Sequence, residues 1–151
     1  MAKFALLYIV LQAAIQFSPL GPLENAIASI EAGWLGLENE GSLIHTSNGL
    51  FEINASCTGL VSASVLAAVI FALKKPKLKK KIAVFLAGGI SLFVLNFVRV
   101  FVVLLVAQIW GSGAAEIVHT VSWISTAALV LTVWYFGMKK IAKVKDFSSL
   151  L

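Results

Sequence analysis

The sequence predicts an all-α polytopic membrane protein, and three observations support this prediction. The chain has 151 residues, of which 60% are hydrophobic and only 13% are charged. A soluble domain of this size has too little interior to bury so much apolar surface, whereas its apolar runs are long enough to cross a bilayer. Blocks of lysine and blocks of glutamate alternate between these runs. We expect a single integral membrane domain, residues 1–151, with about four transmembrane helices at residues 4–20, 57–73, 82–109 and 117–138.

The placement of charge predicts how the four helices cross the membrane. Every lysine falls near a terminus or in the 74–81 loop, and every glutamate falls on the opposite side of a four-span arrangement. Because cytoplasmic loops are enriched in lysine and arginine, both termini and the 74–81 loop are expected in the cytoplasm. The net charge of +5 is thereby explained by topology, and we expect no nucleic acid partner. The expected location is the plasma membrane, with residues 21–56 outside the cell.

The first run, residues 4–20, is expected to remain as a membrane span. Lys3 and the apolar stretch after it resemble the start of a signal peptide, but no clear small-x-small cleavage site follows. A cleaved signal peptide is the alternative. Pro19 and Pro22 are expected to end the helix.

Residues 21–56 are expected to form a small structure outside the membrane. The apolar residues Leu23, Ile27, Ile30 and Trp34 are spaced as in a helix that lies along the interface, with Trp34 as its anchor. An ordinary loop packed on the bundle is the alternative for residues 23–40. Further on, Ser47-Asn48-Gly49 predicts a β-hairpin, because Asn-Gly favours a two-residue turn between short strands. Such a hairpin would lead directly into Cys57.

Three residues of distinct chemistry lie at similar distances from the lysine-marked edges. Cys57 precedes Lys74 by 17 positions, Arg99 follows Lys81 by 18, and His119 precedes Lys139 by 20. In antiparallel helices these separations correspond to roughly 26, 27 and 30 Å. A thiol, a guanidinium and an imidazole are therefore expected at one level near the face opposite the lysines, which suggests a nucleophile, an oxyanion donor and a base.

Cys57 is the only cysteine, so no internal disulfide can form. Asn54 or Ser56 is expected to cap the second span, and the partial positive charge of a helix N-terminus favours the thiolate. A small packing residue is the alternative role for a cysteine in a membrane helix.

Arg99 is expected to have a partner or a use, because an arginine inside a membrane span costs about 3 kcal/mol or more. Snorkelling to the outer headgroups is the alternative. Asn96 lies one turn away on the same face, where it either holds the guanidinium or bonds a neighbouring helix.

His119 is expected in the first turn of the fourth span, where the helix dipole favours the neutral imidazole that a general base needs. An interfacial histidine bonded to water or a headgroup is the alternative. Glu116, one turn earlier, either orients the ring or simply suits a helix start. His45 is expected to be an exposed hairpin residue. With one cysteine and two histidines, we expect neither a metal site nor a cofactor.

Taken in series, three motifs of this chain resemble the exosortase/archaeosortase family. They are Ser56-Cys57-Thr58-Gly59-Leu60 at the head of a span, Asn96-x-x-Arg99, and His119-Thr120-Val121-Ser122 at the next outward helix start. Their order, spacing and membrane placement match the family over about residues 40–137. The resemblance implies a polytopic membrane cysteine transpeptidase, although four spans would make this chain a short member beside relatives with about eight.

The resemblance also implies an activity and its partners. Members act on exported proteins whose C-terminus carries a short motif, a membrane span and a basic tail, and a lipid is a possible acceptor. Carried onto this sequence, Cys57 would form a thioester, His119 would move protons, and Arg99 would stabilise the oxyanion, with Asn96 and Glu116 in support. Two alternatives stay open. One is another membrane thiol enzyme, such as an acyltransferase or an intramembrane protease, and the other is a non-catalytic helical accessory protein.

Overall fold

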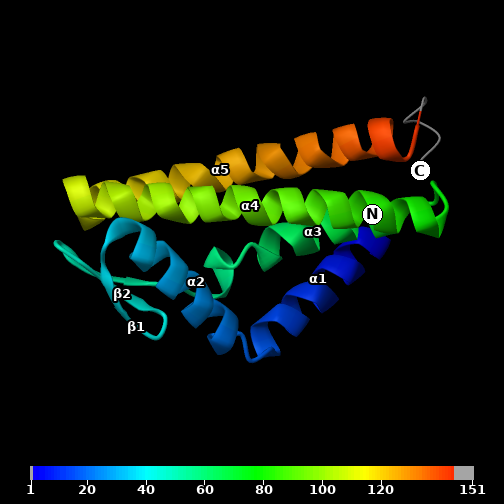
Figure 1. Ribbon diagram of the computed structural model, residues 1–151. Coiled ribbons are helices and arrows are strands. Elements are labelled where there is room, and N and C mark those ends of the chain that lie inside the picture. Colours follow the sequence, from blue (N-terminus) through cyan, green and yellow to red (C-terminus); the bar gives the residue numbers. More distant parts are fainter. Residues whose placement is uncertain (1, 145–151) are drawn as a thin grey trace.

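The computed structural model of the chain describes residues 2–144, and helices make up most of this part (Figure 1). Two long helices run side by side, and shorter helices and a small sheet cover one side of the pair. In chain order the elements are α1 (Ala2–Phe17), α2 (Gly21–Leu35), β1 (Glu38–Glu40), β2 (Leu43–Thr46), β3 (Gly49–Glu52), a 3₁₀ turn at Ala55–Cys57, α3 (Leu60–Ala72), α4 (Leu78–Trp110), α5 (Ser112–Phe136) and a π-helical turn at Gly137–Ile141.

The expectation of an all-α membrane protein is confirmed by the two long helices. Within residues 2–144, Leu78–Trp110 and Ser112–Ile141 are long and apolar enough to cross a bilayer. Their 33 and 30 residues correspond to roughly 50 and 45 Å, well beyond the 30 Å hydrocarbon core. Both helices are therefore longer than is needed to cross the hydrocarbon core, and the small sheet lies beside one end of the pair.

The two remaining expected spans correspond to shorter helices. The 16 residues of α1 reach roughly 24 Å and the 13 of α3 roughly 20 Å, so neither alone matches the hydrocarbon core. Among the described residues the number of candidate spans rises from two to three if α1 and α2 are counted as one broken span. Four complete spans stay a prediction.

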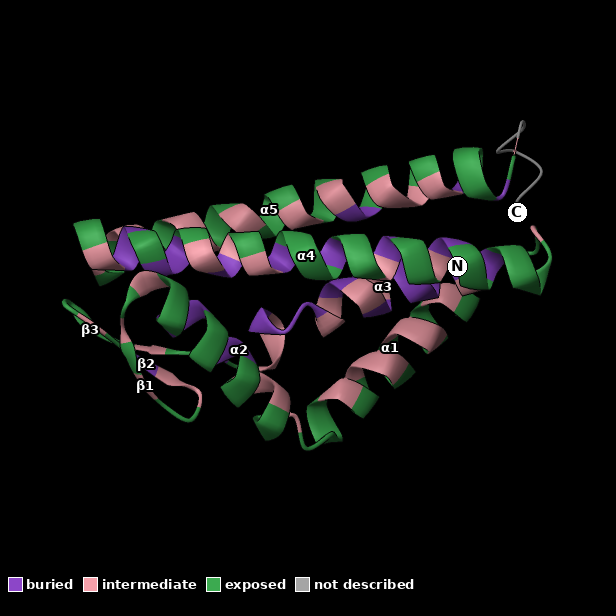
Figure 2. Cartoon of the chain, viewed as in Figure 1, coloured by how far each residue is buried: buried purple, intermediate pink, exposed green. Residues whose placement is uncertain are grey.

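Helix α2 turns away from α1 by 78°, at the break that Pro19 and Pro22 were expected to cause. The expected helix after this break is confirmed, and it ends at Gly36, which adopts the left-handed conformation with φ of 67°. Trp34 is 62% exposed, and its ring lies 6.1–6.2 Å from those of Phe97 and Phe101 on α4. Figure 2 shows that α2 presents a buried face to the rest of the chain. That face consists of Ile27, Ala28, Glu31 and Ala32.

The predicted hairpin is confirmed, with one strand more than expected. Strands β2 and β3 pair antiparallel, and Thr46 lies opposite Gly49, so Ser47 and Asn48 form the two-residue loop. Strand β1 adds a third strand on the far side of β2. The hairpin loop is fastened to the end of α4, because Ser47 and Asn48 bond the backbone or side chain of Gln108. His45 is exposed, as the sequence predicted.

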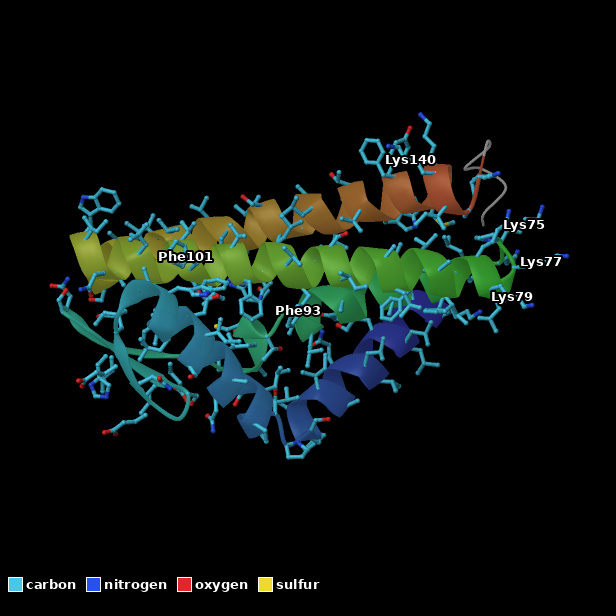
Figure 3. All side chains as sticks on the ribbon, in the orientation of Figure 1. Lys75, Lys77, Lys79, Phe93, Phe101 and Lys140 are labelled. Atoms are coloured by element: carbon cyan, nitrogen blue, oxygen red, sulfur yellow. The ribbon has the colours of Figure 1, made fainter. Side chains whose placement is uncertain are left out.

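The lysines gather at one end of the molecule, away from the sheet. Lys75, Lys77, Lys79 and Lys140 lie there in Figure 3, at the end where α1 begins and α5 finishes. Two lysines of α4 also fasten this end. Lys80 donates to the carbonyl of Ala142 at 3.0 Å, and Lys81 donates to the carbonyl of Leu73.

The segment that carries Cys57 is a turn and not the first turn of a helix. Asn54 caps it by accepting from the backbone N–H of Ser56 at 3.0 Å. The expected cap is thus present, but it caps the 3₁₀ turn Ala55–Cys57, and α3 starts only at Leu60. Between them Gly59 adopts φ of 80°, which reverses the chain into α3. The expected span 57–73 therefore begins three residues too early.

We expect a side chain at Gly59 to destabilise the fold. A Cβ on it would lie 3.3 Å from Cβ of Asn96, and an L-residue at this φ carries a conformational cost of its own. We expect Gly59→Ala to lower the free energy of unfolding by about 1–2 kcal/mol, measured by thermal or denaturant unfolding in detergent. Gly89→Ala is the control, because the structure shows open space there, and it should leave stability equal or higher. Equal effects of the two substitutions on stability would contradict the close packing of Gly59 against Asn96.

The buried carboxyl of Glu31 leads to a second prediction, which concerns how the free energy of unfolding depends on pH. It lies fully buried in the segment expected outside the membrane, and within residues 2–144 neither carboxyl oxygen has a hydrogen-bond partner. Burial raises the pKa of Glu31 from 4.5 to about 7. The folded chain therefore holds this proton more tightly than the unfolded chain, so stability falls as the pH rises from 4.5 to 7.

We expect Glu31→Gln to remove this part of the pH dependence and to be more stable than the wild type above pH 7. The measurement is the unfolding midpoint in detergent at a series of pH values. Glu40→Gln, an exposed acid on β1, should keep the wild-type slope. A Glu31→Gln variant with an unchanged slope would show that this carboxyl is not buried in solution.

Candidate active site

The three candidate residues are positioned by three different elements. Cys57 lies on the 3₁₀ turn, Arg99 on α4 and His119 on α5. Cys57 is buried, with 2% of its surface exposed, whereas Arg99 and His119 are half-buried. The structure joins these elements through one continuous set of polar contacts, in which Asn96 and Ser122 are the intermediates.

Asn96 connects the Cys57 turn to Arg99. Its Nδ2 donates to the backbone carbonyl of Cys57 at 2.5 Å, and its Oδ1 accepts from Nη1 of Arg99 at 3.4 Å. The sequence offered two roles for this residue, a partner for the guanidinium or a bond to a neighbouring helix. The structure shows the first, and in place of the second it shows a bond to the 3₁₀ turn that carries Cys57. Because Gly59 lacks a side chain, the turn approaches Asn96 closely enough for this bond to form.

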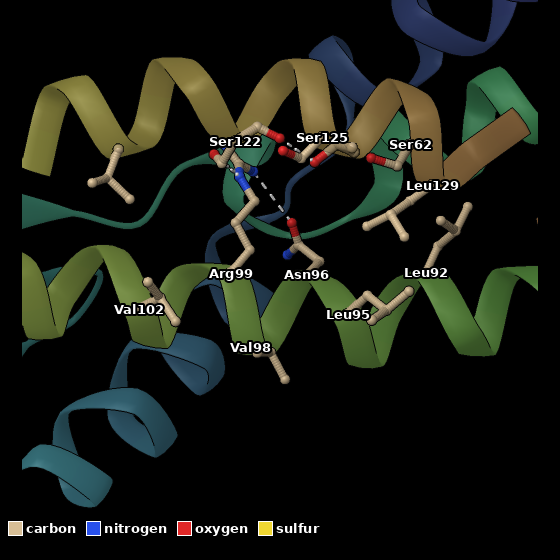
Figure 4. A pocket seen from close by; sticks show the side chains of 12 residues that line it. Ser62, Leu92, Leu95, Asn96, Val98, Arg99, Val102, Ser122, Ser125 and Leu129 are labelled. Carbon is tan, nitrogen blue, oxygen red and sulfur yellow. Dashed lines mark hydrogen bonds between the residues drawn. The ribbon is translucent and has the colours of Figure 1, made fainter. Parts of the chain in front are cut away.

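Arg99 reaches from α4 across to α5, as Figure 4 shows. Its Nε donates to Oγ of Ser122 at 2.6 Å, and its Nη2 lies 3.4 Å from Nε2 of His119. The guanidinium carbon also lies 4.9 Å from the centre of the Trp123 ring, within range of a cation–π interaction. Arg99 therefore has partners inside the protein, and the alternative of an arginine extended to the headgroups is not what the structure shows.

The contact with Arg99 bears on the protonation state of His119. Guanidinium nitrogens only donate hydrogen bonds, so a hydrogen bond at this 3.4 Å contact requires Nε2 of His119 as the acceptor. Such a bond is compatible with a neutral ring and not with a doubly protonated one. Neutral imidazole was predicted from a place at a helix start, and that reason is wrong, since α5 begins at Ser112 and His119 lies two turns inside it.

Cys57 and His119 line one cavity of about 330 Å³ beneath the hairpin. Glu116 and Glu52 also line it, together with residues of β3 and the end of α4. Within the described residues the His119 ring is bonded by Arg99, and no hydrogen bond joins it to Glu116 or to the Cys57 thiol. Cys57 and His119 therefore share a cavity without a direct bond between thiol and ring.

Arg99 faces a second cavity of about 250 Å³ between α4 and α5. Asn96 and Ser122 line it with Arg99, and Leu92 and Leu129 continue its apolar wall toward the lysine end. Arg99 thus borders this second cavity, while its Nη2 contacts His119, which lines the cavity beneath the hairpin. Cys57 and His119 therefore line one cavity and Arg99 lines the other, and the contact between Arg99 and His119 joins the two.

Sequence reasoning assigned no role to Ser122 and Trp123, although both contact Arg99. They lie three and four residues after His119, so one helical face carries all three side chains. This spacing is the feature of the sequence that could have identified Ser122 and Trp123 as neighbours of His119.

Comparison with known proteins identifies a family. The sequence matches the transmembrane exosortase family over residues 2–136. No curated protein and no solved structure matches the chain. The family match includes all three candidate residues and every helix of the bundle. The chain therefore belongs to the transmembrane exosortase family.

Proposed function

We propose that this chain is a membrane cysteine transpeptidase that cleaves a C-terminal sorting signal of exported proteins. It would hold the new C-terminus as a thioester on Cys57 and transfer it to a lipid or another amine-bearing acceptor. The observation that carries the proposal is the set of contacts linking Cys57, Asn96, Arg99 and His119, whose side chains line two cavities. Family membership supports the same chemistry.

The first half of the reaction forms the thioester. The sulfur of Cys57 attacks the carbonyl carbon of the scissile peptide bond, and its proton passes to the unprotonated ring nitrogen of a neutral His119. The carbonyl oxygen becomes an oxyanion, and Arg99 stabilises it through N–H groups that its protein partners leave free. When the C–N bond breaks, the leaving amine takes the proton from His119, and the acyl group remains on sulfur.

The second half transfers the acyl group. The acceptor amine or hydroxyl attacks the thioester, its proton passes through His119, and the Cys57 thiolate leaves and is reprotonated. Water in place of the acceptor would give hydrolysis. The half-buried site and the apolar walls of the adjoining cavity limit access of water, which favours transfer.

The orientation of the site follows from charge. The lysine end belongs in the cytoplasm by the positive-inside rule, so the sheet, the hairpin and Cys57 belong on the outer side. An exported protein held in the membrane by a single span would present its polypeptide to this side. The cavity beneath the hairpin, which Cys57 and His119 share, is the proposed place for the scissile bond.

Cys57→Ala tests the proposal. We expect this variant to lose all processing of a tagged exported substrate in membranes, because no other thiol exists in the chain. Cys57→Ser should also be inactive or nearly so, since a hydroxyl is a far weaker nucleophile than a thiol at neutral pH. Processing is read as the size shift of the substrate on a gel.

The control is that both variants insert and unfold in detergent as the wild type does. Normal processing by Cys57→Ala would end the proposal and favour the non-catalytic accessory role. A Cys57-dependent activity that modifies a lipid but never a protein would favour the acyltransferase instead.

A further inference from the structure

Ser122 joins the two halves of the candidate site through a single oxygen atom. Its Oγ accepts from Nε of Arg99 at 2.6 Å and donates to the backbone carbonyl of His119 at 2.6 Å. A hydroxyl has one proton, and here the carbonyl takes it, because a carbonyl can only accept. The lone pairs of Oγ are thereby left for Arg99, so the direction of both bonds is determined.

The bond that Nε of Arg99 donates to Ser122 is the shortest of the hydrogen bonds that hold the guanidinium. The other two, to Asn96 and to His119, are both 3.4 Å long, beyond the usual range for N–H donors. Nε lies where the side-chain stem meets the planar group, so a short bond at Nε restricts how the plane rotates about the stem. Without it, the two long contacts alone would have to orient the group.

We propose that Ser122 is a positioning residue that holds the Arg99 guanidinium in the plane required for catalysis. Five N–H groups are available on a guanidinium, and the protein uses three. One N–H on each terminal nitrogen remains, and in a fixed plane these two form a fork for the oxyanion. This inference rests on the proposed transpeptidase function, and it adds a residue to which the sequence analysis gave no role.

The position favours a small hydroxyl residue for a physical reason. In a helix the hydroxyl of serine or threonine reaches back to the carbonyl three or four residues earlier, as Ser122 does to His119. Threonine would keep that geometry, and its extra methyl has room because Ser122 lines the open cavity between α4 and α5. Alanine would remove both bonds and leave the helix intact.

A double-mutant cycle tests whether Ser122 acts through Arg99. We expect Ser122→Ala to lower kcat about tenfold with little change in KM, because a hydrogen bond to a charged group is lost. Ser122→Thr should restore most of the rate. Arg99→Lys should lower kcat by about a hundredfold, because an ammonium lacks the planar fork. In that background Ser122→Ala should cost less than twofold more.

Ser91→Ala is the matched control, since its hydroxyl on α4 bonds the carbonyl of Ala87 in its own helix, in the same way that Ser122 bonds His119. It should keep the wild-type kcat. A wild-type kcat in Ser122→Ala would overturn the inference, as would a full tenfold loss in the Arg99→Lys background or a failure of threonine to restore the rate.

A second measurement separates this inference from the proposed function. Arg99 is the only arginine of the chain, so protein labelled with ¹⁵N-arginine gives one Nε–H signal. In detergent we expect hydrogen exchange of this group to be about tenfold faster in Ser122→Ala than in the wild type, and near wild type in Ser122→Thr and Ser91→Ala. Equal exchange in Ser122→Ala and wild type would overturn the contact itself. Slow exchange that depends on Ser122, together with no Cys57-dependent processing, would overturn only the catalytic role.

Discussion

The rest of the candidate site depends on the contacts that the guanidinium of Arg99 makes. A charged group at this level of a membrane helix is costly unless the protein gives it partners, and here α4 supplies Asn96 while α5 supplies Ser122, His119 and the Trp123 ring. One side chain therefore connects the two long helices beside the turn that carries Cys57. If Arg99 were removed, α4 and α5 would keep their apolar packing, but the His119 ring and the Asn96 amide would lose the side chain that both contact.

The chain reaches this geometry by interrupting a helix. Residues 55–59 form a 3₁₀ turn and a glycine reversal before α3 begins, so Cys57 is presented from a turn and its carbonyl meets Asn96. The hairpin then covers the cavity, and its loop is fastened to Gln108 at the far end of α4. The C-terminal end of α4 thus holds the hairpin in place beside the cavity.

Much of this arrangement could be predicted from the sequence. The long apolar runs and the segregation of lysine from glutamate predicted the membrane class, and Asn48-Gly49 predicted the hairpin. Equal spacing from the lysine edges predicted that Cys57, Arg99 and His119 would lie at one depth, and the contacts of Arg99 agree with that prediction. The family resemblance drawn from these motifs is confirmed, while the catalytic roles of the residues stay predictions.

The parts that could not be predicted depend on the packing of residues distant in sequence. Hydropathy did not reveal that α5 starts at Ser112, because its first turn is made of small residues and resembles a loop. Nor did it reveal that α3 is delayed to Leu60, because that depends on how closely Gly59 approaches Asn96. Glu31 looked like one acid among several in an exposed segment. Only the packing of α2 on its neighbours shows that this carboxyl is fully buried.

The mass of the adduct trapped on Cys57 tests the central claim most directly. Wild-type protein in membranes would be mixed with a substrate carrying a C-terminal sorting signal, quenched in acid without an acceptor, and digested. The account predicts that the peptide containing Cys57 gains the mass of the substrate fragment upstream of the cleaved bond, attached through a thioester that hydroxylamine removes. Full processing of the substrate by the Cys57→Ala variant under the same conditions, or a fatty acyl group in place of a peptide on the wild-type cysteine, would contradict it.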